Sequence, residues 1–301
     1  MMKLLRSISH FMQVSTGLSL LLPLLLLFPF SSIAAEKEVL LGILAKRGGE
    51  HTLQKWQPTA DYLSREIPGY HFSIIPLGFD VISPTVAAEE VDFILANSSF
   101  YVELEARYGV KRIATLRNRV GETISTEFGG VIFSRADRDD INVIQDLKKH
   151  SFMAVNENSL GGFRMAWGEL QRHKIDPHKD LSVLKFGGTH DAVVYAVLKG
   201  EVDVGTVRSD TLERMAQEGQ IDLTDFKLIA HHLINDKADF PFLHSTALYP
   251  EWPFASLIST PPELAQIVAV ALLGMPPESE AAIAAKSAGW GVPLNYQPVH
   301  D

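Results

Sequence analysis

The apolar and polar positions along the chain alternate between two periods. Short apolar runs such as "EVLLGILA" (38–45) and "VDFILA" (91–96) are typical of buried strands. The segment "TLQKWQPTADYLSREI" (52–67) instead repeats its apolar residues at helical spacing. Strands and helices follow one another with short connections, which predicts an α/β fold whose sheets are mostly parallel and flanked by helices.

The strand and helix rhythm starts again near residue 129, which indicates two lobes of similar build. The segments "EEVDFILANSSFYVELE" (89–105) and "GEVDVGTVRSDTLERM" (200–215) echo one another. We expect residues 36–128 with 231–301 to form the first lobe and residues 129–230 the second. Loops beyond the strand ends would then form a ligand cleft between the lobes. A helix is also expected over "INVIQDLKK" (141–149).

The first 34 residues have the layout of a secretory signal. Lys3 and Arg6 precede an apolar run from Leu18 to Phe30, and the small residues of "SSIAAE" follow. We therefore expect residues 1–34 to be a cleaved signal peptide of an exported protein. An uncleaved membrane anchor is the alternative, because residues 11–30 supply 20 positions.

The composition excludes several kinds of site. The 301 residues include no cysteine, so disulfides, thiol nucleophiles and thiolate metal sites are ruled out. Without the signal, 25 basic side chains face 36 acidic ones, a net charge of −11, which disfavours nucleic-acid binding. His231 and His232 are neighbours on an expected strand, where adjacent side chains point to opposite faces. We therefore predict no metal site and no cofactor.

The stretch "NENSLGGFRMAWGEL" (156–170) is a polar loop that passes through Gly161 and Gly162 into a helical pattern. The first turn of a helix presents unpaired N–H groups, so this loop could cradle an anion. An ordinary tight turn from strand to helix explains the same pattern.

Other candidate donors follow the predicted strands. Ser98, Ser99 and Tyr101 come after "VDFILA", where hydroxyl groups suit an oxyanion and equally suit a helix cap. Arg208 offers a fork that fits a two-oxygen anion, or it forms a salt bridge to Asp210 or Glu213. The remaining candidates from these patterns are Thr206 and Arg47.

The succession "DLKK", "NSLGGF" and "GGTHDAVVYAVLKGEVDVGTVRSDTLERM" resembles the periplasmic phosphate/phosphite/phosphonate-binding protein family from about Val39 onward. The resemblance implies a two-lobed type II periplasmic binding protein with no catalytic residues. It also implies that Ser159, Gly161, Gly162 and His190 belong to the ligand site. The family's loop resembles Ser-x-Ser-Gly, whereas Leu160 and the two glycines follow Ser159 here, so phosphonate itself is in doubt.

Further segments, among them "TEFGGVIFSRADR", "STALYPEWPF" and "GWGVPLNYQPVH", are similar to the input domains of tetrathionate-sensor-type histidine kinases. This similarity implies an oxidised sulfur anion as ligand, with phosphonate or phosphite second. The partner would be an ABC permease or a sensor kinase, and the chain could also be a stand-alone or truncated sensor input domain. An enzyme on the same fold is the less favoured alternative, because no Gly-x-Ser-x-Gly elbow is present.

Overall fold

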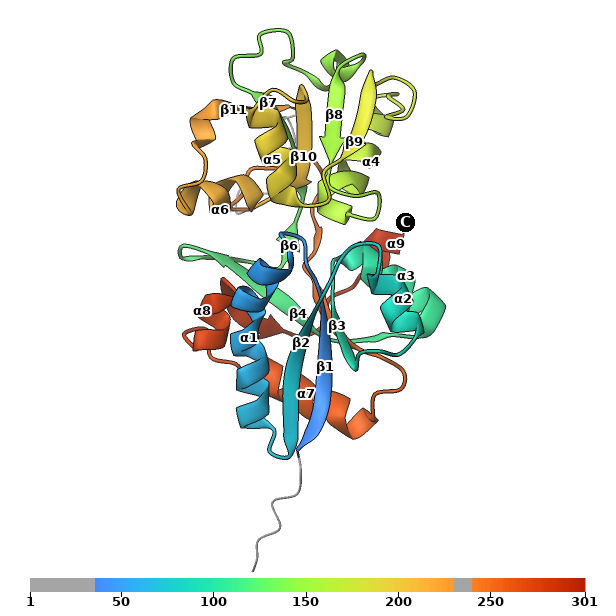
Figure 1. Cartoon of the computed structure of the whole chain (residues 1–301), viewed down its shortest axis with the longest axis vertical. Coiled ribbons are helices and arrows are strands. Elements are labelled where there is room, and N and C mark those ends of the chain that lie inside the picture. Colours follow the sequence, from blue (N-terminus) through green and yellow to red (C-terminus); the bar gives the residue numbers. More distant parts are fainter. Residues whose placement is uncertain (1–35, 230–239, 301) are drawn as a thin grey trace, which may run out of the picture. The chain divides into compact units, whose positions relative to one another are not determined.

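The computed structural model describes residues 36–229 and 240–300. The predicted signal peptide and the pair His231 and His232 lie outside the described residues. Along the described part of the chain, no helix is both long enough and apolar enough to cross a bilayer. The fold is built on two main sheets (Figure 1).

The first sheet has seven strands in the order β14-β4-β13-β3-β1-β2, with β5 paired to β4. β1 runs parallel to β2 and β3, but the other four pairings are antiparallel. The sheet is therefore mixed, and the prediction of a mostly parallel sheet is wrong. The reason is that the C-terminal tail returns to insert β13 between β3 and β4 and to add β14 at the edge. The strands are β1 (Lys37–Leu44), β2 (Tyr70–Leu77), β3 (Phe93–Leu95), β4 (Lys111–Val120), β5 (Thr123–Ser125), β13 (Pro253–Ser256) and β14 (Ser287–Gly291).

The second sheet has five strands in the order β11-β7-β10-β8-β9. It is mixed as well, because β7 runs antiparallel to both β10 and β11, while β8 runs parallel to β10 and β9. Its strands are β7 (Gly130–Arg135), β8 (Ser151–Ala154), β9 (Val183–Phe186), β10 (Val204–Arg208) and β11 (Phe226–Ile229).

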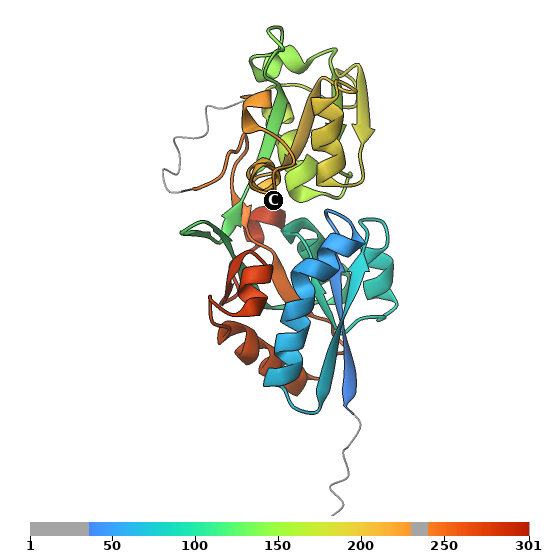
Figure 2. The same cartoon turned by 60° about the vertical axis from the view of Figure 1, so that its left-hand side comes forward.

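Helices from distant parts of the sequence accompany each sheet. With the first sheet, α1 packs against α7 and α8, while α3 packs against α2 and α9, so the red tail of Figure 1 lies beside the blue N-terminal elements (Figures 1 and 2). These helices are α1 (Gly49–Glu66), α2 (Ile82–Ala87), α3 (Ser98–Tyr108), α7 (Pro262–Leu273), α8 (Glu280–Ala284) and α9 (Gln297–His300). Those following strands of the second sheet are the π-helical turn η2 (Leu160–Arg164), α4 (Met165–Arg172), α5 (His190–Leu198), α6 (Thr211–Gln217) and the 3-10 turn η3 (Leu223–Asp225).

The helix expected over residues 141–149 is wrong. Only the 3-10 turn η1 (Ile144–Leu147) forms there. The Asp146 carboxylate accepts the backbone N–H groups of Asn142 and Val143, which holds the chain in a capped turn. Lys149 then takes a positive φ of 66°, which ends any helical continuation.

The internal echo in the sequence has a structural counterpart. Asp92, just before β3, accepts the N–H of Leu40 on the neighbouring strand β1 at 2.7 Å. Asp203, just before β10, accepts the N–H of Ser151 on β8 at 2.8 Å. In both sheets the aspartate of the Val-Asp pair thus joins two parallel strands, so its role is structural.

Two segments connect the sheets. The first contains β6 (Glu127–Phe128) and the second contains β12 (Tyr249–Pro250), and these two short strands pair antiparallel. Beyond the pair, the Ser245 N–H donates to the Gly130 carbonyl at 2.8 Å, so the returning segment runs beside β7. Both crossings therefore lie together, next to the residues that follow β10.

Candidate anion-binding site

A cavity of about 210 Å³ lies between the end of β1, helix α1 and the residues that follow β10. Its walls combine apolar side chains, including those of Trp56 and Trp252, with a cluster of basic ones. Among the described residues that line it, Asp210 carries the only carboxylate. The basic side chains of the lining are those of Lys46, Arg47, Lys55, Arg208, Arg214 and Lys286.

The turn after β1 sets the first wall of the cavity. Gly48 has a φ of 95°, which glycine adopts readily, so the chain can turn at once from strand to helix. This turn presents Lys46 and Arg47, and α1 then adds Lys55. The carbonyl of Lys46 accepts the N–H of His190 at 3.2 Å, which ties this wall to the start of α5.

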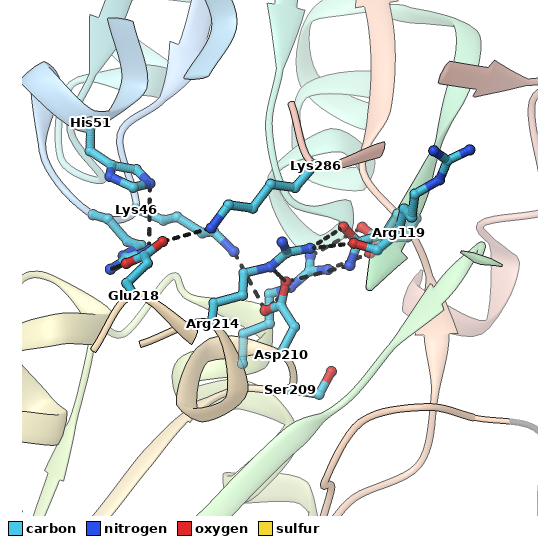
Figure 3. Close-up of polar contacts among 12 residues, drawn as sticks. Lys46, His51, Arg119, Ser209, Asp210, Arg214, Glu218 and Lys286 are labelled. Atoms are coloured by element: carbon cyan, nitrogen blue, oxygen red, sulfur yellow. Dashed lines mark hydrogen bonds and ion pairs between the residues drawn. The ribbon is translucent and has the colours of Figure 1, made fainter. Parts of the chain in front are cut away.

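Asp210 is the centre of the charge arrangement (Figure 3). Its carboxylate lies 3.8 Å from Lys46 Nζ, and it accepts from Arg208 Nε at 3.2 Å and from Arg214 Nε at 2.8 Å. Burial opposes its ionisation, but the three neighbouring cations outweigh that effect and hold the pKa of Asp210 well below its ordinary range. Its φ of 78° is rare outside glycine, a local strain that is typical of functional sites.

Arg208 forms the floor of the cavity. Its two terminal nitrogens donate to the two oxygens of Glu251, with the Nη1 to Oε2 distance at 3.1 Å. The guanidinium also stacks over the Phe128 ring at 4.3 Å. The fork expected to grip an anion is therefore engaged by a protein carboxylate, and Arg208 contributes to the cavity as a buried, paired cation.

A second group of ion pairs surrounds Arg47. Its guanidinium donates to Asp191 at 2.6 Å and to Glu218 at 2.8 Å. Lys286, which comes from the tail, reaches the same Glu218 carboxylate at 2.7 Å (Figure 3). Glu218, at the end of α6, thereby connects the turn after β1 with the residue that precedes β14.

The two lysines differ from the arginines in how they are compensated. Desolvation by burial lowers the pKa of Lys46 to about 7, although Asp210 acts in the opposite direction. Desolvation, followed by repulsion from Arg214, lowers the pKa of Lys55 well below its ordinary range. Burial likewise lowers the pKa of His51 to about 4 and that of His190 well below its usual value. The two lysines are therefore less well compensated than the arginines, and burial disfavours their charged form.

The loop around Gly161 and Gly162 packs against this cavity without lining it. Ser159 caps the π-helical turn by accepting the N–H of Gly162 at 3.2 Å. A void of about 10 Å³ lies beside Ser159 and Gly161, with room for about one water molecule. It is shared with Asn97, His190 and Arg208. The loop and the residues after β3 do meet, as the sequence suggested, but around a space too small for an oxyanion in this structure.

His190 has a defined tautomer in this environment. Its Nδ1 accepts the N–H of Arg208 at 3.2 Å, so the neutral ring carries its proton on Nε2. His190 lines the small void, so its Nε2–H can donate a hydrogen bond to a group bound in that void.

Four predicted contacts lie apart from the large cavity. Ser98 donates to the Pro250 carbonyl at 2.5 Å, and Ser99 accepts from Arg164. The Tyr101 hydroxyl donates to Glu105, and its ring packs on Tyr296. Thr206 is fully buried in β10, and its hydroxyl has no hydrogen-bond partner among residues 36–229 and 240–300. Their role as ligand contacts stays a prediction.

Sequence reasoning missed most of the cations that surround the cavity. The sequence patterns indicate Arg47, but not its neighbour Lys46 or the helical pair Lys55 and Trp56. A usable signal is nevertheless present, because Lys55 lies in the second turn of the helix that begins directly after Lys46, Arg47 and Gly48. Arg214 and Lys286 carried no such local signal.

The two mixed sheets flanked by helices have the two-lobed α/β fold of periplasmic binding proteins. PhnD1 from Prochlorococcus marinus in complex with methylphosphonate superposes with a TM-score of 0.72, covering 88% of this chain and 96% of that one at 14% identity. XAC2383 from Xanthomonas citri bound to ATP gives a TM-score of 0.65, with 88% and 96% coverage at 20% identity. These structures confirm the predicted fold class.

Residues 41–297 match the family described as "ABC transporter, phosphonate, periplasmic substrate-binding protein", and the chain belongs to that family. It is also 34% identical over 260 residues to the tetrathionate sensor histidine kinase TtrS of Salmonella typhimurium. That alignment covers 86% of this chain but 42% of the kinase, so the chain spans less than half the length of this relative. The resemblance predicted from the sequence is confirmed.

Proposed function

We propose that this chain is a non-enzymatic binding protein of the periplasm that captures a small oxyanion in the lysine and tryptophan cavity. The observation that carries this proposal is a pair of partly buried lysines that carboxylates compensate poorly. Burial removes part of the hydration of Lys46 and Lys55, and a bound anion would compensate by stabilising their charged forms.

The cavity draws its charged groups from both sheets. Lys46 and Lys55 follow β1, whereas Arg208 and Arg214 end β10 and enter α6. A ligand can contact both sets of basic side chains only when the two sets are close together. Binding would therefore favour the closed arrangement of the lobes. A membrane partner would recognise that arrangement.

An enzyme on this fold could be imagined to use Ser159, His190 and Asp191 as a catalytic set, but these side chains are arranged for other tasks. The Ser159 hydroxyl caps a helical turn, and Asp191 pairs with Arg47 and not with His190. His190 accepts a backbone N–H through Nδ1, so no relay from carboxylate to imidazole to hydroxyl forms. These contacts favour binding over nucleophilic catalysis.

For the ligand we propose an oxidised sulfur anion first, with phosphonate or phosphite second. The similarity to TtrS supports the first, and the family supports the second. The same two findings set the alternatives for the partner, which would be a signalling kinase or an ABC permease. Loss of labelled ligand uptake on gene deletion would favour the permease, and loss of a transcriptional response with intact uptake would favour signalling.

The test of binding is a thermal-shift series on the purified protein at constant ionic strength. We expect at least one anion among sulfate, thiosulfate, tetrathionate, phosphate, phosphite and methylphosphonate to raise the melting temperature, because a ligand that binds only the folded state stabilises it. Sodium chloride at the same ionic strength is the control. Unchanged melting temperatures with every anion of the panel would contradict the proposal.

A further inference from the structure

The ion pairs around the cavity form two groups. Five of the six lining cations pair with a carboxylate, and the carboxylates that pair with them are Asp191, Asp210, Glu218 and Glu251. Among the described residues, none of these four carboxylates pairs with a cation outside the set. With all six cations protonated, six positive charges against four negative ones leave a net charge of +2 at the site.

The surplus can be assigned to two side chains. Arg47, Arg208, Arg214 and Lys286 each contact a carboxylate at 3.2 Å or closer. Lys46 is 3.8 Å from Asp210, which the two arginines contact more closely. Lys55 has no carboxylate within 4.0 Å in the described part of the chain, and its ammonium lies 5.1 Å from the Trp56 ring centroid. Lys46 similarly lies 5.6 Å from the Trp252 ring.

The remaining titratable groups of the walls do not cancel or increase this charge. His51 stays neutral near pH 7, since its pKa is about 4, and His190 is neutral as well. The other described lining residues are uncharged, among them Leu44, Leu116, Asn118 and the two tryptophans. Since Asp210 is the only carboxylate among the described lining residues, an anionic ligand would supply the negative charge that the two lysines lack.

We infer that the site selects doubly charged anions, with Lys46 and Lys55 as the specificity-determining residues that match the two charges of the ligand. This inference rests on the proposed function and refines its ligand class. A singly charged anion of the same shape would leave one partly buried lysine without a negative partner, which disfavours the charged form of that lysine. A dianion would compensate both.

The same geometry predicts proton uptake on binding. At pH 8 the free protein holds fewer than two charged lysines in the cavity, because both pKa values are lowered, chiefly by burial. The charged groups that face them are Asp210, Arg208 and Arg214, with Glu251 also acting on Lys46. A dianion raises both pKa values again, so each molecule bound at pH 8 draws protons from the buffer.

Isothermal titration calorimetry with matched anions tests the inference on the purified full chain. The pairs are sulfate against perchlorate and methylphosphonate against methanesulfonate at pH 8.5, which are similar in shape and differ in charge; thiosulfate and tetrathionate complete the set. We expect the tightest dianion to bind at least a hundredfold more tightly than any monoanion of the set. Titrations in two buffers of different ionisation enthalpy should show net proton uptake for the dianion.

Variants assign the effect to the lysines. Lys55→Met should weaken dianion binding at least tenfold and reduce proton uptake, whereas Lys55→Arg should retain selectivity for the dianion. Lys185→Met, which removes an exposed lysine on β9, should change neither. Lys55→Met should also melt no lower than the wild type, since it removes an uncompensated charge, so its binding can be measured on folded protein.

The outcomes separate the two proposals. If a monoanion binds as tightly as its matched dianion, or if Lys55→Met keeps full selectivity, the inference of a dianion site is overturned while the proposed oxyanion binding stands. If no anion of the set binds, the proposed function fails and the inference fails with it.

Discussion

Replacing Gly162 with alanine should destabilise the protein, because the space beside this glycine is already filled. A β-carbon there would lie 2.5 Å from Val155 Cγ2 and 2.6 Å from Ser159 Oγ. Real β-carbons essentially never approach so closely, so either the valine or the capping serine must move. Overpacking of this kind costs about 1–3 kcal/mol.

Gly168→Ala is the matched control on the helix that follows. A β-carbon at Gly168 would meet no atom within 4 Å, and the residue lies inside α4. Alanine is favoured over glycine in a helix by about 1 kcal/mol, so this variant should be slightly more stable than the wild type. The two variants should therefore differ by about 2–4 kcal/mol in their free energies of unfolding.

Urea unfolding followed by circular dichroism measures both variants, and at about 2–4 °C per kcal/mol the difference is also visible in thermal melts. A Gly162→Ala variant as stable as the wild type would refute the packing described for this loop. Weaker anion binding at unchanged stability would instead favour the role of the loop as an anion cradle. The experiment thus distinguishes a glycine needed for packing from one needed for a ligand.

Three further predictions concern the cavity. The ligand-free protein should gain stability as the pH rises from 7 to 10. In the folded state the pKa of Lys46 is lowered from 10.5 to about 7, so in this range the folded state binds fewer protons than the unfolded state. Lys46→Met should therefore reduce the slope of melting temperature against pH. Glu251→Gln leaves the buried Arg208 without its two-oxygen partner and should cost about 3–5 kcal/mol in urea unfolding. Trp252→Phe should reduce the change in tryptophan fluorescence on sulfate addition, whereas Trp167→Phe, outside the cavity, should preserve it.

Each of these has an outcome that would contradict it. A melting temperature that falls between pH 7 and 10, or a Lys46→Met variant with the wild-type slope, would show that this lysine is not desolvated in the folded state. Wild-type stability of Glu251→Gln, with the exposed Glu263→Gln as control, would show that the pair with Arg208 contributes little. An unchanged fluorescence response in Trp252→Phe would place the ligand elsewhere.

The cavity that we propose as the anion site is assembled from segments that are far apart along the chain. Lys46 and Arg47 follow the first strand, Arg214 lies in α6, and Lys286 precedes the last strand. Nothing in the local pattern around Lys286 indicates that its ammonium lies 2.7 Å from Glu218. That contact exists only because the C-terminal tail returns to the first sheet and adds β14 to its edge.

The contacts of the Arg208 guanidinium likewise could not be predicted from the local sequence. Its position at the end of a predicted strand is apparent in the sequence, which also allows a salt bridge to Asp210. The stronger partner, Glu251, is 43 positions away and enters through the segment that connects the two sheets. Only the fold could decide between a free fork and an engaged one.

What the sequence determined by itself is local and periodic. The strands at residues 38–45 and 91–96, the helix after residue 52, and the aspartate of each Val-Asp pair follow from runs of apolar residues and short connections, because burial of one face depends on near neighbours. Tertiary structure decided the strand directions of the mixed sheets and the place of the site. The loop at Gly161 and Gly162 packs beside a void of about 10 Å³, while the surplus charge gathers around Lys46 and Lys55. The physical reason is that a pKa and a cavity depend on every group within a few ångströms, whatever its distance along the chain.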